Sequence, residues 1–365
     1  MIHVCTPFLN GNEEKYISEA MKTNWISSSG KYISLFEKAF AKFCGVKYGI
    51  AVTNGTVALH LALVALGMKK GDEVIMPNFT MIASANAVCY TGATPVFVDA
   101  EPDTWNIDTK KIEGKITSKT KAIMPVHLFG LPCEMDKINE LAKKYNLKVI
   151  EDAAEAHGAE YKGKKCGNLG DIACFSFFSN KIVTTGEGGM VVTNDKELAD
   201  KCRYLKNLCF GERRDYIHND IGFNYRMSNL HAAIGLAQTE KADEYVKLRI
   251  NNNKIYKREL GKNKEVIFQK QQPSTINSCW MNAILLKGID RDKLMDYLKE
   301  KGVETRLLFT GMNKQPCLEK FGCNMDGEYP ITEWITKNGL YLPSSSELKE
   351  EEIVKICNLI KESIK

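Results

Sequence analysis

The sequence has little of several features that mark specialised proteins. Its 365 residues include only 10 prolines, and it has no low-complexity tract and no internal repeat, which argues against disorder and fibrous architectures. Its 12 cysteines are scattered, and no two of them have the short C-x₂₋₄-C spacing of a zinc site. We therefore interpret them as mostly buried, reduced thiols and expect no metal site.

A targeting signal and a membrane span are also missing. Residues 1–8 contain no basic region followed by an apolar stretch. The most apolar stretch, residues 56–68, is too short to cross a bilayer and carries His60, so it predicts a buried helix. We expect a cytoplasmic protein without a membrane partner.

Charge of one sign does not dominate the chain. The 50 basic and 45 acidic residues give a formal net charge of +5, and lysine and glutamate are mixed along the whole length. Because the sequence has neither a basic arm nor an acidic tail, it does not favour a nucleic-acid partner.

What the sequence does contain is an alternation of strand and helix patterns. Between about residues 49 and 194, short and mostly apolar β-branched runs alternate with longer helical patterns, as in a mainly parallel sheet with helices on both faces. The strand candidates are residues 49–53, 73–76, 95–98, 121–126, 148–151, 172–177 and 190–193. Functional groups are then expected at the C-terminal ends of these strands.

A smaller pattern follows in the last third of the chain. The sequence is helical from Asn229 to about Leu260 and becomes mixed after that. The elements expected in the mixed region are a strand at 282–286 and helices at 291–301 and 349–363. We predict an α/β fold with a large domain, residues 1–238, holding the mostly parallel central sheet, and a smaller α+β C-terminal domain, residues 239–365.

The first candidate site is a strand that runs into Gly55, with a helix starting at Thr56. Glycine permits close approach of the backbone, and the amides at a helix N-terminus can hold an anion such as phosphate. Taken alone, the segment also fits a plain strand–turn–helix unit capped by Thr56.

The second candidate is a pair of adjacent carboxylates at the end of a buried strand. An ionised and unpaired Asp152 would be costly there, and a buried cation such as a protonated ring nitrogen would offset that cost. Alternatively, Asp152 is the N-cap of a helix. Glu155 and His157 equally fit solvated or hydrogen-bonded polar residues.

The third candidate is Lys181, which stands between an aromatic strand and the glycine-rich turn 186–189. Partial desolvation lowers the pKa of an amine and favours its neutral, nucleophilic form, which is the chemistry of a Schiff-base lysine. The alternative is an ordinary surface lysine.

In this order along the chain, a phosphate cup, a strand-end carboxylate and a lysine are what pyridoxal phosphate requires of a protein. With these segments the sequence resembles the pyridoxal-phosphate-dependent sugar aminotransferases of the DegT/DnrJ/EryC1/StrS family, within the fold type I aminotransferases. The similarity spans nearly the whole chain. The segments that carry it are residues 24–31, 54–60, 151–155, 175–181, 185–189 and 222–227.

The resemblance implies roles for single residues. Lys181 would be the Schiff-base lysine and later the general acid and base, and Asp152 would pair with the pyridinium nitrogen. The implied cofactor-binding residues are the amides of Gly55 and Thr56 with Ser176 at the phosphate, Glu155 near the phenolic oxygen, Met81 against the ring, and Asn224 from a second subunit. Many relatives have an aromatic residue where this chain has Met81, and sulfur–ring packing is an adequate substitute. A homodimer with shared active sites is implied as well.

The implied reaction transfers an amino group from glutamate, through the pyridoxamine form of the cofactor, to a nucleotide-linked keto sugar. Within the family the resemblance is greatest to the perosamine and viosamine synthases, which make 4-amino-4,6-dideoxy sugars from nucleotide-linked 4-keto-6-deoxyhexoses. GDP, UDP and dTDP all remain open as the nucleotide. One alternative is a sugar 3-dehydratase, but such enzymes resemble this chain with histidine in place of the Schiff-base lysine, so Lys181 argues against it. Another is a cofactor-binding sensor or regulator without turnover.

Overall fold

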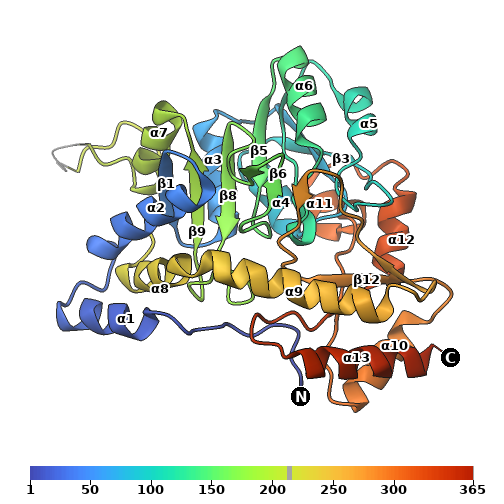
Figure 1. The fold of residues 1–365 in the computed structure, drawn as a ribbon. Coiled ribbons are helices and arrows are strands. Elements are labelled where there is room, and N and C mark those ends of the chain that lie inside the picture. Colours follow the sequence, from blue (N-terminus) through green and yellow to red (C-terminus); the bar gives the residue numbers. More distant parts are fainter. Residues whose placement is uncertain (212–215, 365) are drawn as a thin grey trace.

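The computed structural model describes residues 1–211 and 216–364, and a seven-stranded sheet lies at its centre (Figure 1). The strands are β1 (Tyr48–Val52), β2 (Glu73–Pro77), β3 (Thr94–Val98), β4 (Thr120–Ile123), β5 (Lys148–Asp152), β8 (Ile172–Ser176) and β9 (Gly189–Thr193), in the spatial order β1-β9-β8-β5-β4-β2-β3. Of these seven, β9 alone is reversed, being antiparallel to both β1 and β8. The predicted α/β fold is confirmed, and each strand candidate overlaps an observed strand.

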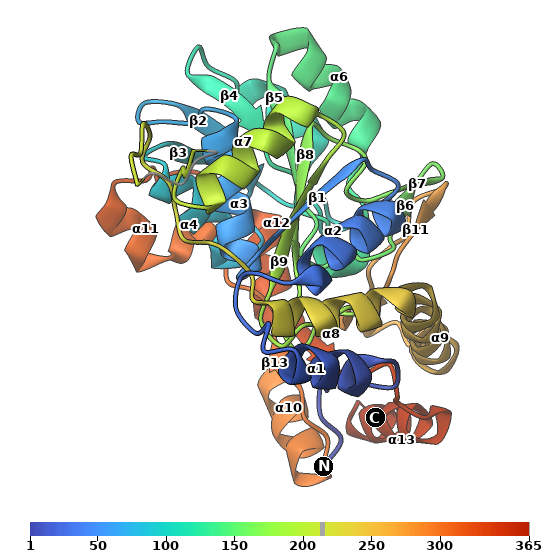
Figure 2. The same cartoon turned by 90° about the vertical axis from the view of Figure 1, so that its left-hand side faces the viewer.

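Helices cover both faces of the sheet because successive residues of a strand point to opposite sides. In β1, Ile50 and Val52 belong to one buried cluster and Ala51 belongs to another. The first cluster contains α3 (Gly55–Ala65), α4 (Ile82–Tyr90) and α7 (Lys196–Lys206), and the second contains α2 (Lys31–Cys44) and α8 (Asn229–Glu240). Figure 2 shows these two sets of helices on opposite sides of the sheet. The helices α1 (Glu13–Lys22) and α6 (Met135–Tyr145) pack against α8 and against β4 and β5, respectively.

The buried helix predicted from the apolar stretch is α3. His60 on this helix is 6% exposed, and its Nδ1 lies 3.0 Å from the hydroxyl oxygen of Tyr225. The helix begins at Gly55 rather than at Thr56, because Asn54 is the N-cap: its side-chain oxygen accepts the N–H of Val57 at 3.0 Å. The expectation of a cap at Thr56 is therefore wrong.

A second, antiparallel sheet lies in the C-terminal third of the chain. Its strands are β10 (Val266–Phe268), β12 (Asn282–Leu286), β14 (Gly339–Leu342) and β13 (Arg306–Leu307), in that spatial order. The helices α9 (Ala242–Leu260), α10 (Arg291–Glu300) and α13 (Glu350–Ser363) pack around its aliphatic side chains. The strand and two helices expected in this region are confirmed. In Figure 1, α9 runs below the large sheet towards α13. The domain boundary after residue 238 stays a prediction.

The remaining elements are short. They are α5 (Thr109–Ile112), α11 (Pro316–Phe321), α12 (Pro330–Asn338) and a small sheet of β11 (Thr275–Ile276), β6 (Glu160–Tyr161) and β7 (Lys164–Lys165). The start of the chain lies against its last third, since Ile2 pairs with Val303 and the N–H of Thr6 donates to Oγ of Ser345 at 2.9 Å. The twelve cysteines are free thiols, and all but Cys5 and Cys317 are buried. Among residues 1–211 and 216–364, no helix combines the length and the apolar character needed to span a membrane.

Candidate active site

A cavity of about 650 Å³ opens where β1, β2, β5 and β8 end. Seven of the eight residues singled out from the sequence line it: Gly55, Thr56, Met81, Asp152, Glu155, Ser176 and Lys181. They come from four separate stretches of the chain, which meet here because parallel strands present their C-terminal ends at one edge. Met81, which follows β2, is half exposed. The structure thus brings the predicted residues together, while their individual roles remain predictions.

The wall formed by the start of α3 is tightly packed. A Cβ added at Gly55 would lie 2.8 Å from Cβ of Ser176, so glycine lets the helix start and the end of β8 touch. Gly189 in β9 pairs with Val52 on one side and with Ser176 on the other. A Cβ at Gly189 would lie 2.3 Å from the carbonyl oxygen of Asn54. Together, these close contacts make a cup at a helix N-terminus, where amide N–H groups favour an anion.

Asp152 ends β5 and is 4% exposed. Its Oδ2 accepts the hydroxyl of Ser84 at 2.6 Å, and its Oδ1 accepts the N–H of Ala154 at 3.2 Å. Burial raises the pKa of Asp152, although the hydrogen bond from Ser84 opposes that change. The chain directly after Asp152 forms turns and then β6 rather than a helix, so the alternative of a helix N-cap is wrong. A cationic partner in the cavity would stabilise this carboxylate.

Lys181 and Glu155 complete the polar part of the cavity. Burial lowers the pKa of the Lys181 amine, while the carboxylates of Glu155 and Asp152 act in the opposite direction. Glu155 is 4% exposed, its Oε2 accepts the N–H of Phe129 at 2.8 Å, and burial raises its pKa to about 7. Glu155 is therefore not a solvated residue, and Lys181 is not an ordinary surface lysine.

His157 differs from both alternatives considered from the sequence. It is fully buried among Phe40, Phe175 and Phe177, and neither ring nitrogen has a hydrogen-bond partner in the described part of the chain. Burial lowers the pKa of His157 to about 3, so the ring is neutral.

Glu151 precedes Asp152 in β5, and its side chain points to the opposite face of the sheet. Its carboxylate is fully buried and accepts four bonds, from the N–H groups of Gly167, Leu169 and Gly170 and from Nε2 of His127 at 3.1 Å. Because Nδ1 of His127 accepts the N–H of Cys133 at 3.1 Å, the ring proton that faces Glu151 lies on Nε2.

The His127–Glu151 pair lies close to Cys166, and all three offer metal-ligand atoms within 4.8 Å of one another. However, four hydrogen-bond donors already occupy the oxygens of Glu151, and Nε2 of His127 carries a proton. The arrangement therefore favours hydrogen bonds that join β5 to residues 127–133 and 167–170 over a metal site. The backbone also joins these segments, since the N–H of His127 donates to the carbonyl oxygen of Asp152 at 3.1 Å.

Asn224 does not line the cavity of its own chain. It is exposed, and its side-chain oxygen accepts Nε of Arg226 at 2.9 Å. Its backbone pairs with that of Asn207, at the end of α7. The structure therefore leaves Asn224 facing outwards, held by its neighbours.

Several residues that line the cavity were not found from the sequence. They include Phe178, Asn180, Trp280, Arg306 and Tyr341. Trp280 and Arg306 come from the C-terminal third, where no local motif marks them. Ser84 lies in the first turn of α4 and donates a hydrogen bond to Asp152 across 68 positions of sequence, which no spacing rule predicts.

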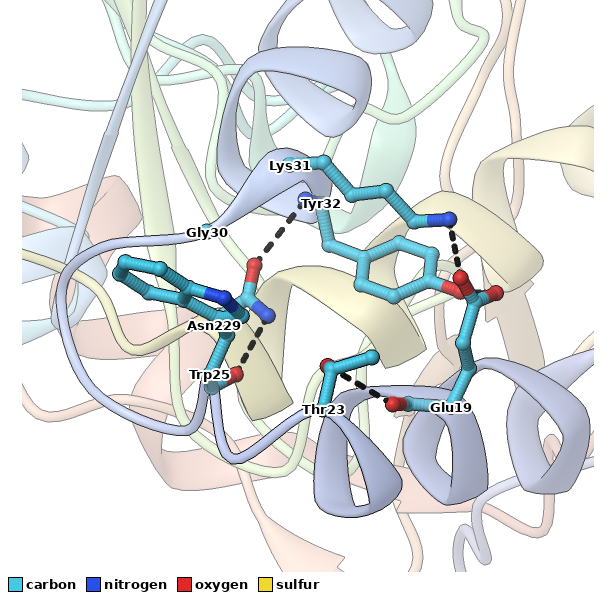
Figure 3. Close-up of a pocket in the computed structure, with 7 residues that line it drawn as sticks. All are labelled: Glu19, Thr23, Trp25, Gly30, Lys31, Tyr32 and Asn229. Carbon is cyan, nitrogen blue, oxygen red and sulfur yellow. Dashed lines mark hydrogen bonds and ion pairs between the residues drawn. The ribbon is translucent and has the colours of Figure 1, made fainter.

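Residues of the segment 24–31 line a second cavity, of about 380 Å³, and their contacts there show why the segment has this sequence (Figure 3). The side chain of Asn229 accepts the N–H of Tyr32 at 3.0 Å and donates to the carbonyl oxygen of Trp25 at 2.6 Å. Gly30 has a φ of 145°, and a Cβ there would lie 2.3 Å from Cγ of Asn229. Asn229 thus ties the segment to α8, and only glycine fits where the segment passes over it.

The main cavity fits pyridoxal phosphate on three counts that the structure itself provides. The start of α3 offers amides to a phosphate, the buried Asp152 needs a cation such as a ring N–H, and Lys181 offers an amine inside the cavity. On this fold, such a site defines a pyridoxal-phosphate-dependent aminotransferase.

The family follows from the comparison with known proteins. The model of the DegT/DnrJ/EryC1/StrS aminotransferase family matches residues 7–361, and the chain belongs to this family. A GDP-perosamine synthase of Escherichia coli O157:H7 is 48% identical over 363 residues, which cover 99% of this chain and 98% of that protein. A GDP-perosamine synthase of Caulobacter vibrioides is 48% identical over 97% of this chain and 96% of its own length. The solved structure of an aminotransferase from Psychrobacter cryohalolentis superposes with a TM-score of 0.91 at 32% identity, covering 98% of each chain.

Proposed function

We propose that the protein transfers an amino group from glutamate to C4 of GDP-4-keto-6-deoxyhexose, giving the 4-amino-4,6-dideoxy sugar of the perosamine type. The observation that carries this proposal is the 48% identity, over nearly the full length of both chains, to a GDP-perosamine synthase. The sequence by itself left GDP, UDP and dTDP open, and the names of the two GDP-perosamine synthases compared above favour GDP.

The residues of the cavity fit the proposed chemistry. When bound, pyridoxal phosphate supplies the electron sink for the transfer. We assign the amides of Gly55 and Thr56 to the phosphate and Asp152 to the ring nitrogen, where its negative charge would keep the nitrogen protonated. Lys181 would hold the cofactor covalently and then carry the proton on Nζ as general base and acid. The lowered pKa of its amine favours the neutral form that a nucleophile and base needs.

The proposal includes a homodimer in which Asn224 completes the phosphate site of the neighbouring subunit. Two features support it: Asn224 lies outside the cavity of its own chain, and Arg226 holds its exposed side chain in one orientation. A symmetric pair of subunits would then exchange this residue in both directions.

The two rival functions predict different outcomes for one experiment. Purified holoenzyme is incubated with glutamate and, in parallel, with GDP-, UDP- and dTDP-4-keto-6-deoxyhexose, and the products are identified by mass and NMR. We expect an amino group at C4 and the highest rate with the GDP sugar. Loss of a C3 oxygen without amination would mean a dehydratase, and no turnover of any sugar by a protein that holds its cofactor would mean a sensor. Amination with preference for another nucleotide would contradict the GDP assignment alone.

A further inference from the structure

Trp280 packs against Lys181, although it comes from the C-terminal third of the chain. The Nζ of Lys181 lies over the indole, 3.8 Å from the ring centroid. Trp280 precedes β12 and is 4% exposed, so the ring forms part of the cavity wall rather than part of the surface. At this distance, the face of an indole attracts a cation more strongly than the face of any other side chain.

Trp280 is fixed in place by three hydrogen bonds, one from its ring and two from its backbone. Its Nε1 donates to the carbonyl oxygen of Asn180 at 2.8 Å. The N–H of Trp280 donates to the carbonyl oxygen of Phe129 at 3.0 Å, and its own carbonyl oxygen accepts the guanidinium of the buried Arg249 at 3.1 Å. Since Asn180 directly precedes Lys181, the indole is tied to the backbone of the lysine that its face covers.

Lys181 has few other partners. Among the described residues, its Nζ makes no hydrogen bond or ion pair, and Glu155, Asp152 and Cys5 act on its charge without such a contact. Burial disfavours the ammonium form of such an amine. The ring face of Trp280 lies in direct contact with Nζ and stabilises this form.

We propose that Trp280 is a positioning residue that holds the amine of Lys181 against the cavity wall, and favours its protonated form, whenever the lysine is free of the cofactor. The inference rests on the proposed role of Lys181. A lysine that moves a proton between two atoms must hold its amine, and the proton on it, in a fixed position while the amine is not bonded to the cofactor. The indole face holds the ammonium group in this position by a cation–π contact. A carboxylate in direct contact would bind the proton more strongly and make its transfer harder.

The test compares Trp280→Phe with Trp280→Leu. Both variants lose the Nε1 donor, but only phenylalanine keeps an aromatic face, so the difference between them isolates the ring. Each full-length protein is loaded with pyridoxamine phosphate, which leaves Lys181 free. Trace acetylation with acetic anhydride over a pH series, followed by peptide mapping, gives the apparent pKa of the Lys181 amine.

We expect the pKa of Lys181 to fall by about one unit in Trp280→Leu, a tenfold change in the protonation equilibrium or about 1.4 kcal/mol, and to fall less in Trp280→Phe. Equal values in the two variants, or a higher pKa in the leucine variant, would overturn the proposal. Should the leucine variant fail to fold, Trp280→Met takes its place as the variant without an aromatic face, and a pKa of Lys181 equal to that in Trp280→Phe overturns the proposal.

A separate arm distinguishes failure of this inference from failure of the proposed function. Wild-type protein loaded with pyridoxal phosphate is reduced with borohydride and mapped. Label on Lys181 supports its role as the cofactor lysine, and label on another lysine, or none, overturns both that role and the inference on Trp280. Label on Lys181 together with equal pKa values in the two variants overturns the inference alone.

Discussion

The hydroxyl of Ser84 donates to Oδ2 of Asp152 at 2.6 Å, and this bond joins the first turn of α4 to the end of β5. It stabilises the ionised carboxylate that burial disfavours. We expect Ser84→Ala to raise the pKa of Asp152 and to lower kcat/KM about tenfold, since a hydrogen bond to a charged group contributes about 1.5–3 kcal/mol. Steady-state kinetics across pH checks this. Ser34→Ala, on the exposed side of α2, is the control, and a Ser84 variant as active as that control would remove the role.

Asp152→Asn tests whether the charge of this side chain matters beyond its shape. The variant should still bind the cofactor, since the phosphate cup is untouched, but it should transfer amino groups poorly because a neutral amide does not hold a ring nitrogen protonated. Absorbance of the bound cofactor and the rate of the glutamate half-reaction measure the two properties separately. A rate within about threefold of wild type, roughly 0.7 kcal/mol in barrier, is inconsistent with the assignment.

Glu155 should make the stability of the cofactor-free protein depend on pH. Its pKa is raised from 4.5 in the unfolded chain to about 7 in the cavity, so the folded state binds the proton more tightly. The resulting stabilisation is complete below about pH 4.5 and is lost as the pH rises through 7. Its size is on the order of 3 kcal/mol.

The measurement is denaturant unfolding of wild type and Glu155→Gln at several pH values between 4.5 and 8. The free energy of unfolding of the wild type should fall relative to that of the variant over this range. Glu160→Gln in β6 provides the control, because Glu160 is partly exposed and hydrogen-bonds none of the cavity residues. Parallel curves for wild type and Glu155→Gln would mean that Glu155 is not protonated in the cavity.

Mixing two inactive variants tests the sharing of Asn224. A homodimer of Lys181→Ala has no working site, and a homodimer of a severely impaired Asn224 variant has none either. In a mixed dimer, one site combines the native Lys181 of one chain with the native Asn224 of the other. With equal mixing, about half the dimers are mixed and each restores one of two sites, so activity should approach roughly a quarter of wild type. If native mass spectrometry shows mixed dimers and activity stays at the level of the separate variants, Asn224 is not shared.

The sequence predicted those parts of the site that local patterns determine. The buried strand ahead of Asp152, the aromatic strand ahead of Lys181 and the turn at Gly55 all depend on neighbouring residues, and the structure places all three at one cavity. The start of α3 was misjudged by one residue because Asn54 and Thr56 are both good capping residues, and only the fold decides between them.

The parts that the sequence did not predict depend on distant contacts. Ser84 reaches Asp152 only because the fold places the first turn of α4 beside the end of β5, and Trp280 reaches Lys181 only because the chain returns to the cavity before β12. Neither residue type is unusual at its position, so no local signal marks it. The burial of Glu155, which changes its protonation, likewise depends on packing rather than on spacing.

Gly189 contacts, from within the sheet, the cup formed by the start of α3 and Ser176, since β9 is the strand between β1 and β8. One half of the cup follows β1 and the other lies at Ser176 in β8, and these two strands do not pair with each other. The hydrogen bonds of β9 to both strands therefore set the distance between the two halves. A ligand that contacts both halves would stabilise the pairing of β9 with β1 and with β8. Occupancy of the cup and the resistance of the β9 amides to hydrogen exchange should consequently rise together, which makes the interior of the sheet a reporter of cofactor binding.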